Sequence, residues 1–149
     1  MRGLRILRSL AFGCALLAAG CDQGRRAVIE RTVPAQGVLT WQGEPLEDYM
    51  ITFYPKDGKR PAAAKTDNEG RFTLGTNGAN DGAVPGEHLV TIVYVGPERQ
   101  EEPGKEEFKP LPPAKVSIPA KFGDPKTTDL AVQVPAEGSS NLDIELSEK

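Results

Sequence analysis

The stretch HLVTIVYV at residues 88–95 is the clearest strand pattern in the chain. Its β-branched and aromatic residues favour an extended backbone, because their side chains fit the pleated surface of a sheet. Alternate side chains of a strand point to opposite faces, so we expect His88, Val90, Ile92 and Tyr94 to share one face. The sequence therefore predicts a long β-strand here, and the segments on either side follow similar patterns.

Short apolar segments separated by turn residues make up most of the chain. In MITFY at residues 50–54, Ile51 and Phe53 are expected on one face, and Met50, Thr52 and Tyr54 on the other. The chain contains 16 Gly and 13 Pro residues, which disfavour helix interiors. Six further strands are expected at residues 37–41, 62–66, 71–74, 115–118, 130–134 and 141–146. The sequence predicts an all-β fold of seven or eight strands.

The segment Asp67-Asn68-Glu69-Gly70 separates two of these expected strands, 62–66 and 71–74. Gly70 would supply a positive φ, and the Asp67 side chain would bond to the backbone of the turn. We therefore expect a tight hairpin here.

Residues 1–20 have the composition of a secretion signal. Three Arg residues lie within the first eight positions without an acidic residue, and an uncharged apolar stretch follows at 10–19. A membrane-spanning helix needs about 20 apolar residues, whereas this shorter stretch fits a signal peptide. The stretch ends in LAAGC at 17–21, with Ala18 three positions before the Cys. This ending resembles a bacterial lipobox, which usually has Leu or Val at that position. The resemblance implies cleavage before Cys21 and attachment of lipid to its sulfur and amine.

Three alternatives to lipid attachment at Cys21 stay open from the sequence. Cys14 is a competing cleavage site with a shorter apolar stretch before it. The segment could also be an ordinary secretory signal, or a buried helix that happens to contain a Cys. Cleavage before Cys21 would leave 15 basic against 21 acidic side chains, and neither a disulfide nor a free thiol. The prediction is a protein anchored to a membrane of the bacterial cell envelope, on its extracytoplasmic side.

Two polar segments are set apart from the expected strands. Residues 21–34 are expected to tether the lipid to a domain that spans 35–146. Residues 96–113 contain five Pro and eight charged side chains. Such a segment buries too little apolar surface to offset its ordering entropy, so we expect a long mobile loop.

An ordered set of short motifs runs through residues 35–146. The motifs are GVLT at 37–40, GEPL at 43–46, ITF at 51–53, TDNEGRFTL at 66–74 and PGEH at 85–88. Together they resemble the carboxypeptidase regulatory-like domain, a member of the transthyretin-like (prealbumin-like) β-sandwich group. The sequence departs from the family pattern at Asp48-Tyr49, where small residues are common, and at His88, where Tyr is usual. The resemblance implies a single prealbumin-like (Ig-like) β-sandwich.

Few side chains are suited to catalysis or metal binding. His88 is the only imidazole, whereas a catalytic His needs an oriented partner and a zinc site needs three or four ligands. Oxygen ligands for calcium are available at residues 67–69, but the expected turn explains the same residues. The formal net charge of −3 provides no basic excess for binding nucleic acid. We therefore expect no enzymatic activity, no cofactor, no metal and no nucleic acid.

Two functions of different classes agree with these features. The first is a non-enzymatic, lipid-anchored envelope protein that acts as an accessory or protein-interaction module. The second is a lipoprotein that binds a sugar or a peptide, with exposed Trp41, Tyr54 or Tyr94 stacking on sugar rings. A cluster of exposed aromatic side chains would favour the second function, and their burial the first. The expected partners are the membrane, through the lipid, and an envelope protein or a glycan.

Overall fold

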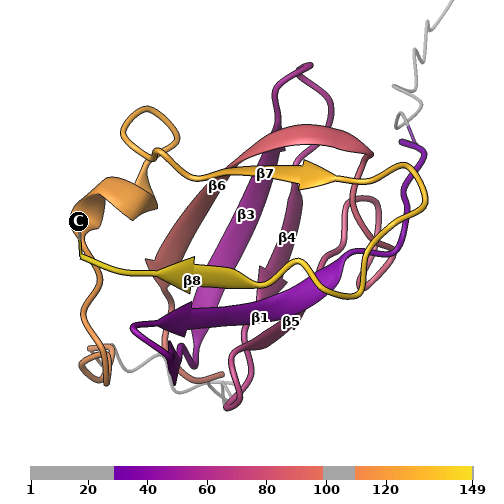
Figure 1. Cartoon of the computed structure of the whole chain (residues 1–149). Coiled ribbons are helices and arrows are strands. Elements are labelled where there is room, and N and C mark those ends of the chain that lie inside the picture. Colours follow the sequence, from indigo (N-terminus) through magenta and orange to yellow (C-terminus); the bar gives the residue numbers. More distant parts are fainter. Residues whose placement is uncertain (1–28, 99–109, 149) are drawn as a thin grey trace, which may run out of the picture.

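The computed structural model describes residues 29–98 and 110–148. Cys21, the predicted signal peptide and most of the predicted loop therefore lie outside the described residues. The described part contains eight strands and one short 3-10 helix, which confirms a predominantly β fold (Figure 1). In chain order the elements are β1 (Gln36–Trp41), β2 (Glu44–Pro45), β3 (Tyr49–Pro55), β4 (Ala62–Lys65), β5 (Arg71–Thr73), β6 (Gly86–Tyr94), η1 (Ala120–Gly123), β7 (Ala131–Val134) and β8 (Ile144–Leu146).

The strands form two four-stranded sheets. One sheet has the order β4-β3-β6-β7, and all its neighbours are antiparallel. In the other sheet, β1 pairs antiparallel with β2 and β5, and parallel with β8. The sheets lie as two layers, with β1 and β8 in front of β3 and β4 in Figure 1. The first and last strands of the described chain are therefore neighbours.

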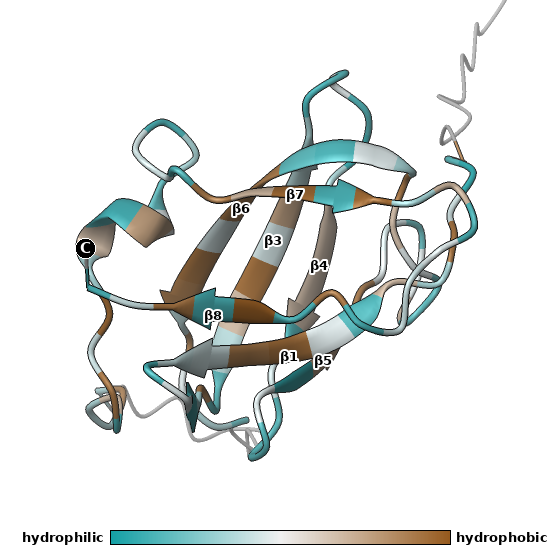
Figure 2. Ribbon diagram, viewed as in Figure 1, coloured by the Kyte–Doolittle hydropathy of each residue, from teal (hydrophilic) through white to brown (hydrophobic). Residues whose placement is uncertain are grey.

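The core lies between the two sheets and follows the predicted alternation along β3. Ile51 and Phe53 are completely buried, whereas Met50, Thr52 and Tyr54 are half-buried on the opposite face. Phe53 reaches across the core to Phe72 of β5, with ring centroids 6.1 Å apart. Hydrophobic and hydrophilic residues alternate along the strands in Figure 2. The prediction for this strand is confirmed.

The turn at residues 67–70 has the predicted chemistry and is closed by a hydrogen bond of 3.0 Å from the Asp67 N–H to the Arg71 carbonyl, but the two strands it joins then pair with each other only at an isolated antiparallel bridge between Ala63 and Gly75. The Asp67 carboxylate accepts the N–H groups of Glu69 and Arg71 at 2.9 Å each, and Gly70 has a φ of 72°. The strand before the turn pairs with β3, however, and the strand after it pairs with β1. The turn thus carries the chain from one sheet to the other. The divergence of β4 and β5 beyond the turn allows Phe72 to contact Phe53 across the core.

The predicted strand at 115–118 is wrong. The chain bends at Lys115 and Val116, and the hydroxyl of Tyr49 donates a hydrogen bond to the Val116 carbonyl. The Tyr49 side chain thus provides the hydrogen bond that a neighbouring strand would otherwise make.

The last strand begins at Ile144, later than the predicted residue 141. The reason is local, because the Asp143 carboxylate accepts the Val38 N–H at 3.0 Å in place of a backbone carbonyl. The helix η1 was not predicted; it buries Phe122.

The chain enters the fold at one end of the two layers. Val33 pairs with Ala83 and belongs to the core. Close by, the Glu30 N–H donates to the Asn77 side chain at 3.0 Å, and the Asn77 amide donates to the Glu30 carbonyl at 2.9 Å. β1 runs from this end toward the opposite one, where Tyr49 and Tyr94 pair across β3 and β6 (Figure 1). We call the two ends the entry end and the Tyr49 end. In the described residues, no helix is both long and apolar enough to cross a membrane.

Candidate functional site

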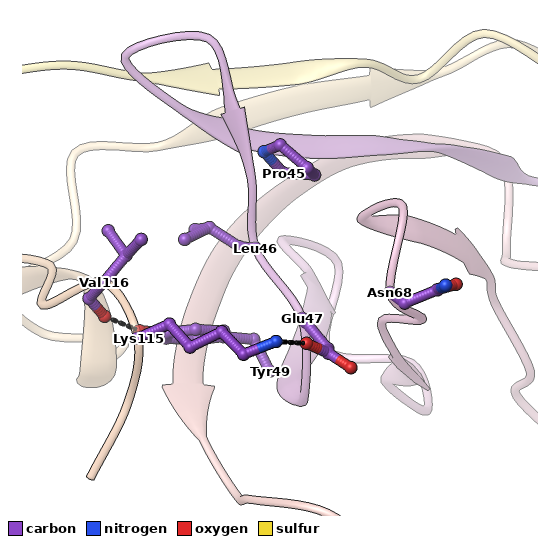
Figure 3. Close-up of a pocket in the computed structure, with 7 residues that line it drawn as sticks. All are labelled: Pro45, Leu46, Glu47, Tyr49, Asn68, Lys115 and Val116. Atoms are coloured by element: carbon purple, nitrogen blue, oxygen red, sulfur yellow. Dashed lines mark hydrogen bonds and ion pairs between the residues drawn. The ribbon is translucent and has the colours of Figure 1, made fainter.

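Two hollows adjoin Tyr49 at the Tyr49 end. The smaller one has a volume of about 200 Å³ and is shown in Figure 3. The larger one, which we call the groove, has a volume of about 510 Å³ and lies along the end of β6. Both are lined by Tyr49 and by parts of the segment 114–118. The smaller hollow is lined by Pro45, Leu46, Glu47, Tyr49, Asn68, Lys115 and Val116.

The backbone around Tyr49 is held by a buried threonine. The Tyr49 N–H donates to the Thr66 hydroxyl at 3.0 Å, and the Thr66 N–H donates to the Tyr49 carbonyl at 2.8 Å. Asp48, just before, has a φ of 64°, a left-handed conformation that is costly for residues other than glycine. Asp48 makes an ion pair of 2.8 Å with Lys65 of β4. These contacts fix the direction in which the Tyr49 side chain leaves β3.

The Tyr49 ring connects β3, β6 and the segment 114–118. It packs against Tyr94 with ring centroids 5.3 Å apart and planes inclined by 60°. Its hydroxyl donates to the Val116 carbonyl. Burial raises the pKa of Tyr49 above 10.0, and the neighbouring Tyr94 raises it further. The hydroxyl is therefore neutral at physiological pH, and its hydrogen bond ties the segment to the sheet.

The rim of the smaller hollow carries opposite charges. Lys115 reaches across it to the carboxylate of Glu47, and Figure 3 shows the pair at its mouth. The hydrogen bond to Glu47 raises the pKa of Lys115. An exposed pair of this kind contributes little to stability, since solvent screens it. The mouth of this hollow is therefore polar and close to neutral in charge.

The groove is the more apolar of the two hollows. Ile92, Val93 and Tyr94 of β6 form one wall, and Ile118 and Pro119 contribute to the other. Val93 keeps 45% of its surface exposed. Ser117 and Asp124 also line the groove. Such a surface suits an apolar group with a polar atom beside it.

His88 lies away from both hollows, inside the core. It is completely buried, its ring centroid is 5.8 Å from that of Phe53, and its Nδ1 lies 3.0 Å from the Gly86 carbonyl. That contact requires a proton on Nδ1, because the carbonyl can only accept. The Nε2 atom is then a buried acceptor, and no partner for it is present in the described residues. His88 is packed, as expected, and does not face a hollow.

Burial of His88 predicts a pH dependence of stability. Burial lowers its pKa from 6.5, although the bond to Gly86 opposes the change. Below pH 6.5, His88 takes up a proton in the unfolded chain but not yet in the folded chain. Lowering the pH from 6.5 toward the pKa of His88 in the folded protein therefore reduces the free energy of unfolding. We expect the free energy of unfolding to fall by about 1 kcal/mol per pH unit below that point.

Urea denaturation between about pH 7.5 and pH 5.5 measures this loss. The control is His88→Leu, which fills a similar volume without a titrating group, so its slope should be nearly flat. Equal slopes in both proteins would contradict the assignment to His88.

The remaining candidate residues take structural positions. Trp41 is only 8% exposed, and Tyr54 and Tyr94 are half-buried on different parts of the β4-β3-β6-β7 sheet. The Asp67 carboxylate is engaged by the turn backbone. Within residues 29–98 and 110–148, no three His, Cys, Asp or Glu side chains lie close enough together to hold a metal ion. The predicted lipid attachment at Cys21 lies outside the described residues.

The chain was compared with family models, curated proteins and solved structures, and none of them matches it.

Sequence reasoning did not find the Tyr49 site. Its parts are distant in the sequence: the 45–49 segment, Asn68, Tyr94 and the 114–124 segment. One signal was present, because Asp48-Tyr49 departs from the pattern of the carboxypeptidase regulatory-like domain that the sequence motifs resemble. Those two residues supply the strained backbone and the aromatic ring on which the site is built.

Proposed function

We propose that this protein is a non-enzymatic, lipid-anchored protein of the bacterial cell envelope, attached through Cys21, that acts as an accessory or protein-interaction module. The observation that carries the proposal is the placement of its aromatic and imidazole side chains. Trp41, Phe53, Phe72 and His88 are all buried in the core. Trp41 could stack on a sugar ring, and the His88 imidazole could take part in acid–base catalysis, only from a surface position.

The positions of the two ends support the same function. The first described residues lie at the entry end, where Glu30 is bonded to Asn77. The groove and the smaller hollow are lined by residues of the Tyr49 end, where β3 begins and β6 ends. A chain anchored through Cys21 would hold these surfaces away from its own membrane, where a second envelope component can reach them.

The alternative function is binding of a sugar or a peptide. It is favoured by the groove, where half-buried Tyr94 and exposed Val93 lie beside polar atoms of Ser117 and Asp124. We also propose the finer fold assignment, a prealbumin-like β-sandwich of the carboxypeptidase regulatory-like type. The two four-stranded sheets and the turn at residues 67–70 support it.

The anchoring step is tested by expressing the chain beside Cys21→Ser and Cys14→Ser variants. The wild-type chain should begin at Cys21, carry the mass of three acyl chains and partition into detergent, because each buried methylene contributes about 0.8 kcal/mol. Cys21→Ser should lose both properties completely, and Cys14→Ser should keep them. An unlipidated, freely soluble wild-type chain would contradict the anchoring. Cross-linking of the lipidated protein in cells then identifies its neighbour; a protein supports the module and a glycan supports the alternative.

A further inference from the structure

The strand β7 is an edge of its sheet with an open outer side. The register pairs His88 with Val132, and the Val90 N–H donates to the Leu130 carbonyl at 3.0 Å. Backbone groups alternate in direction along an antiparallel strand. The N–H and C=O groups of Ala131 and Gln133 therefore point away from β6. In the part of the chain that the structure describes, these four groups have no hydrogen-bond partner, and both residues are exposed.

The other edges are covered, short or charged. On the outer side of β4, Ala63 exchanges two hydrogen bonds of 3.0 Å with Gly75. The strands β2, β5 and β8 have two or three residues each, and they carry Glu44, Arg71 and Glu145. Charges and short length are common devices that keep sheet edges from pairing. The β7 sequence AVQV has no charge and no proline. Among the edges described here, this four-residue strand is therefore the least protected.

We propose that β7 pairs antiparallel with β7 of a second copy of this chain, about a two-fold axis at Val132. In this register Ala131 of one copy lies opposite Gln133 of the other. Each such pair exchanges two backbone hydrogen bonds, and the symmetry provides two pairs, so all eight outward groups of the two strands are satisfied. The two sheets then join into one continuous sheet across the axis.

The chemistry of the edge favours a second copy as the partner. A two-fold contact in this register places Val132 opposite its own counterpart and Ala131 opposite Gln133, so a charge at Val132 would face a like charge. The edge carries only Ala, Val and Gln, and this repulsion is absent. Two four-residue strands bury much less than the roughly 1,200 Å² of a standard interface. We therefore expect a weak dimer that forms with rising protein concentration. The inference does not depend on the lipid anchor.

The register is tested by disulfide trapping in the full chain, purified in detergent, with Cys14→Ser and Cys21→Ser removing the native thiols. Ala131→Cys and Gln133→Cys are prepared as separate proteins and oxidised either alone or as a mixture. The opposed Cα atoms of a hydrogen-bonded pair are about 5.5 Å apart, within reach of a disulfide, whereas the equivalent residues of the two copies lie beyond it. The mixture should cross-link about tenfold faster than either variant alone. The control is Lys126→Cys, an exposed position outside this strand.

A mixture that cross-links no faster than Lys126→Cys would overturn the dimer, and faster linkage within a single variant would overturn the register. A second measurement needs no new thiol. Sedimentation of the thiol-free chain should shift toward the dimer as concentration rises, and Gln133→Pro should abolish the shift. Proline removes an N–H that points outward, so the ladder with β6 stays intact, which far-UV circular dichroism verifies. A third outcome would also overturn the dimer. The chain would stay monomeric at every concentration, and an added uncharged, extended peptide would protect the Ala131 and Gln133 amides from hydrogen exchange. That result would assign the β7 edge to a peptide partner.

Discussion

Replacing Phe53 by Ala should lower the free energy of unfolding by about 3–5 kcal/mol. The side chain is completely buried, and it contacts Phe72 of the other sheet and His88 of the neighbouring strand. Its removal takes away apolar contacts on both sides and leaves a cavity between two sheets that cannot close fully. A domain of this size is stabilised by only about 5–15 kcal/mol, so the variant is expected to be close to its unfolding limit.

The matched control for this change is Tyr54→Ala on the next residue of β3. Tyr54 is half-buried on the opposite face of the same strand, so the backbone context is nearly the same. We expect a loss of about 1 kcal/mol there. Urea denaturation followed by fluorescence of Trp41, the single Trp of the chain, measures both variants. Equal losses would mean that Phe53 is not the centre of the core.

Local patterns in the sequence predicted the parts of the fold that depend on local geometry. Side chains alternate along any strand, so the buried face of β3, with Ile51 and Phe53, followed from the order of residues alone. The turn chemistry of Asp67 and Gly70 was equally predictable, because both act within four residues. What these patterns left out was the sheet to which each strand belongs. That choice depends on the contact between Phe53 and Phe72 across the core.

The Tyr49 end was unpredictable for the same reason. Residues 115–118 alternate as a strand would, and Val116 and Ile118 are half-buried. The segment bends because the Tyr49 hydroxyl binds the Val116 carbonyl, a contact between residues 67 positions apart. The spacing of apolar residues along the sequence does not indicate a contact between such distant residues. The prediction of lipid attachment at Cys21 rests on a local motif, and it stays a prediction because it lies outside the described residues.

Replacing Gly70 by Ala should destabilise the protein by about 3 kcal/mol or more. Gly70 has a φ of 72°, and a Cβ atom there would lie 2.4 Å from the backbone oxygen of Leu39 and 3.2 Å from the Cβ of Pro45. Backbone atoms of a strand cannot move aside as the end of a flexible side chain can. The Gly70 carbonyl also accepts the Leu39 N–H at 2.8 Å, so a shift at this position would break a bond of the first strand.

A comparison with Gly43→Ala separates the two causes of this loss. Gly43 has a φ of 84°, but a Cβ atom on it would have no neighbouring atom within 4 Å, so only the backbone strain applies. That strain costs about 1–2 kcal/mol in a left-handed conformation. The difference between the two variants in urea denaturation therefore reports the steric contribution alone. If both variants lose the same free energy of unfolding, the conclusion that the 67–70 turn packs closely against β1 is wrong. A larger loss for Gly70→Ala supports the interpretation of this turn as the junction that holds the two sheets together.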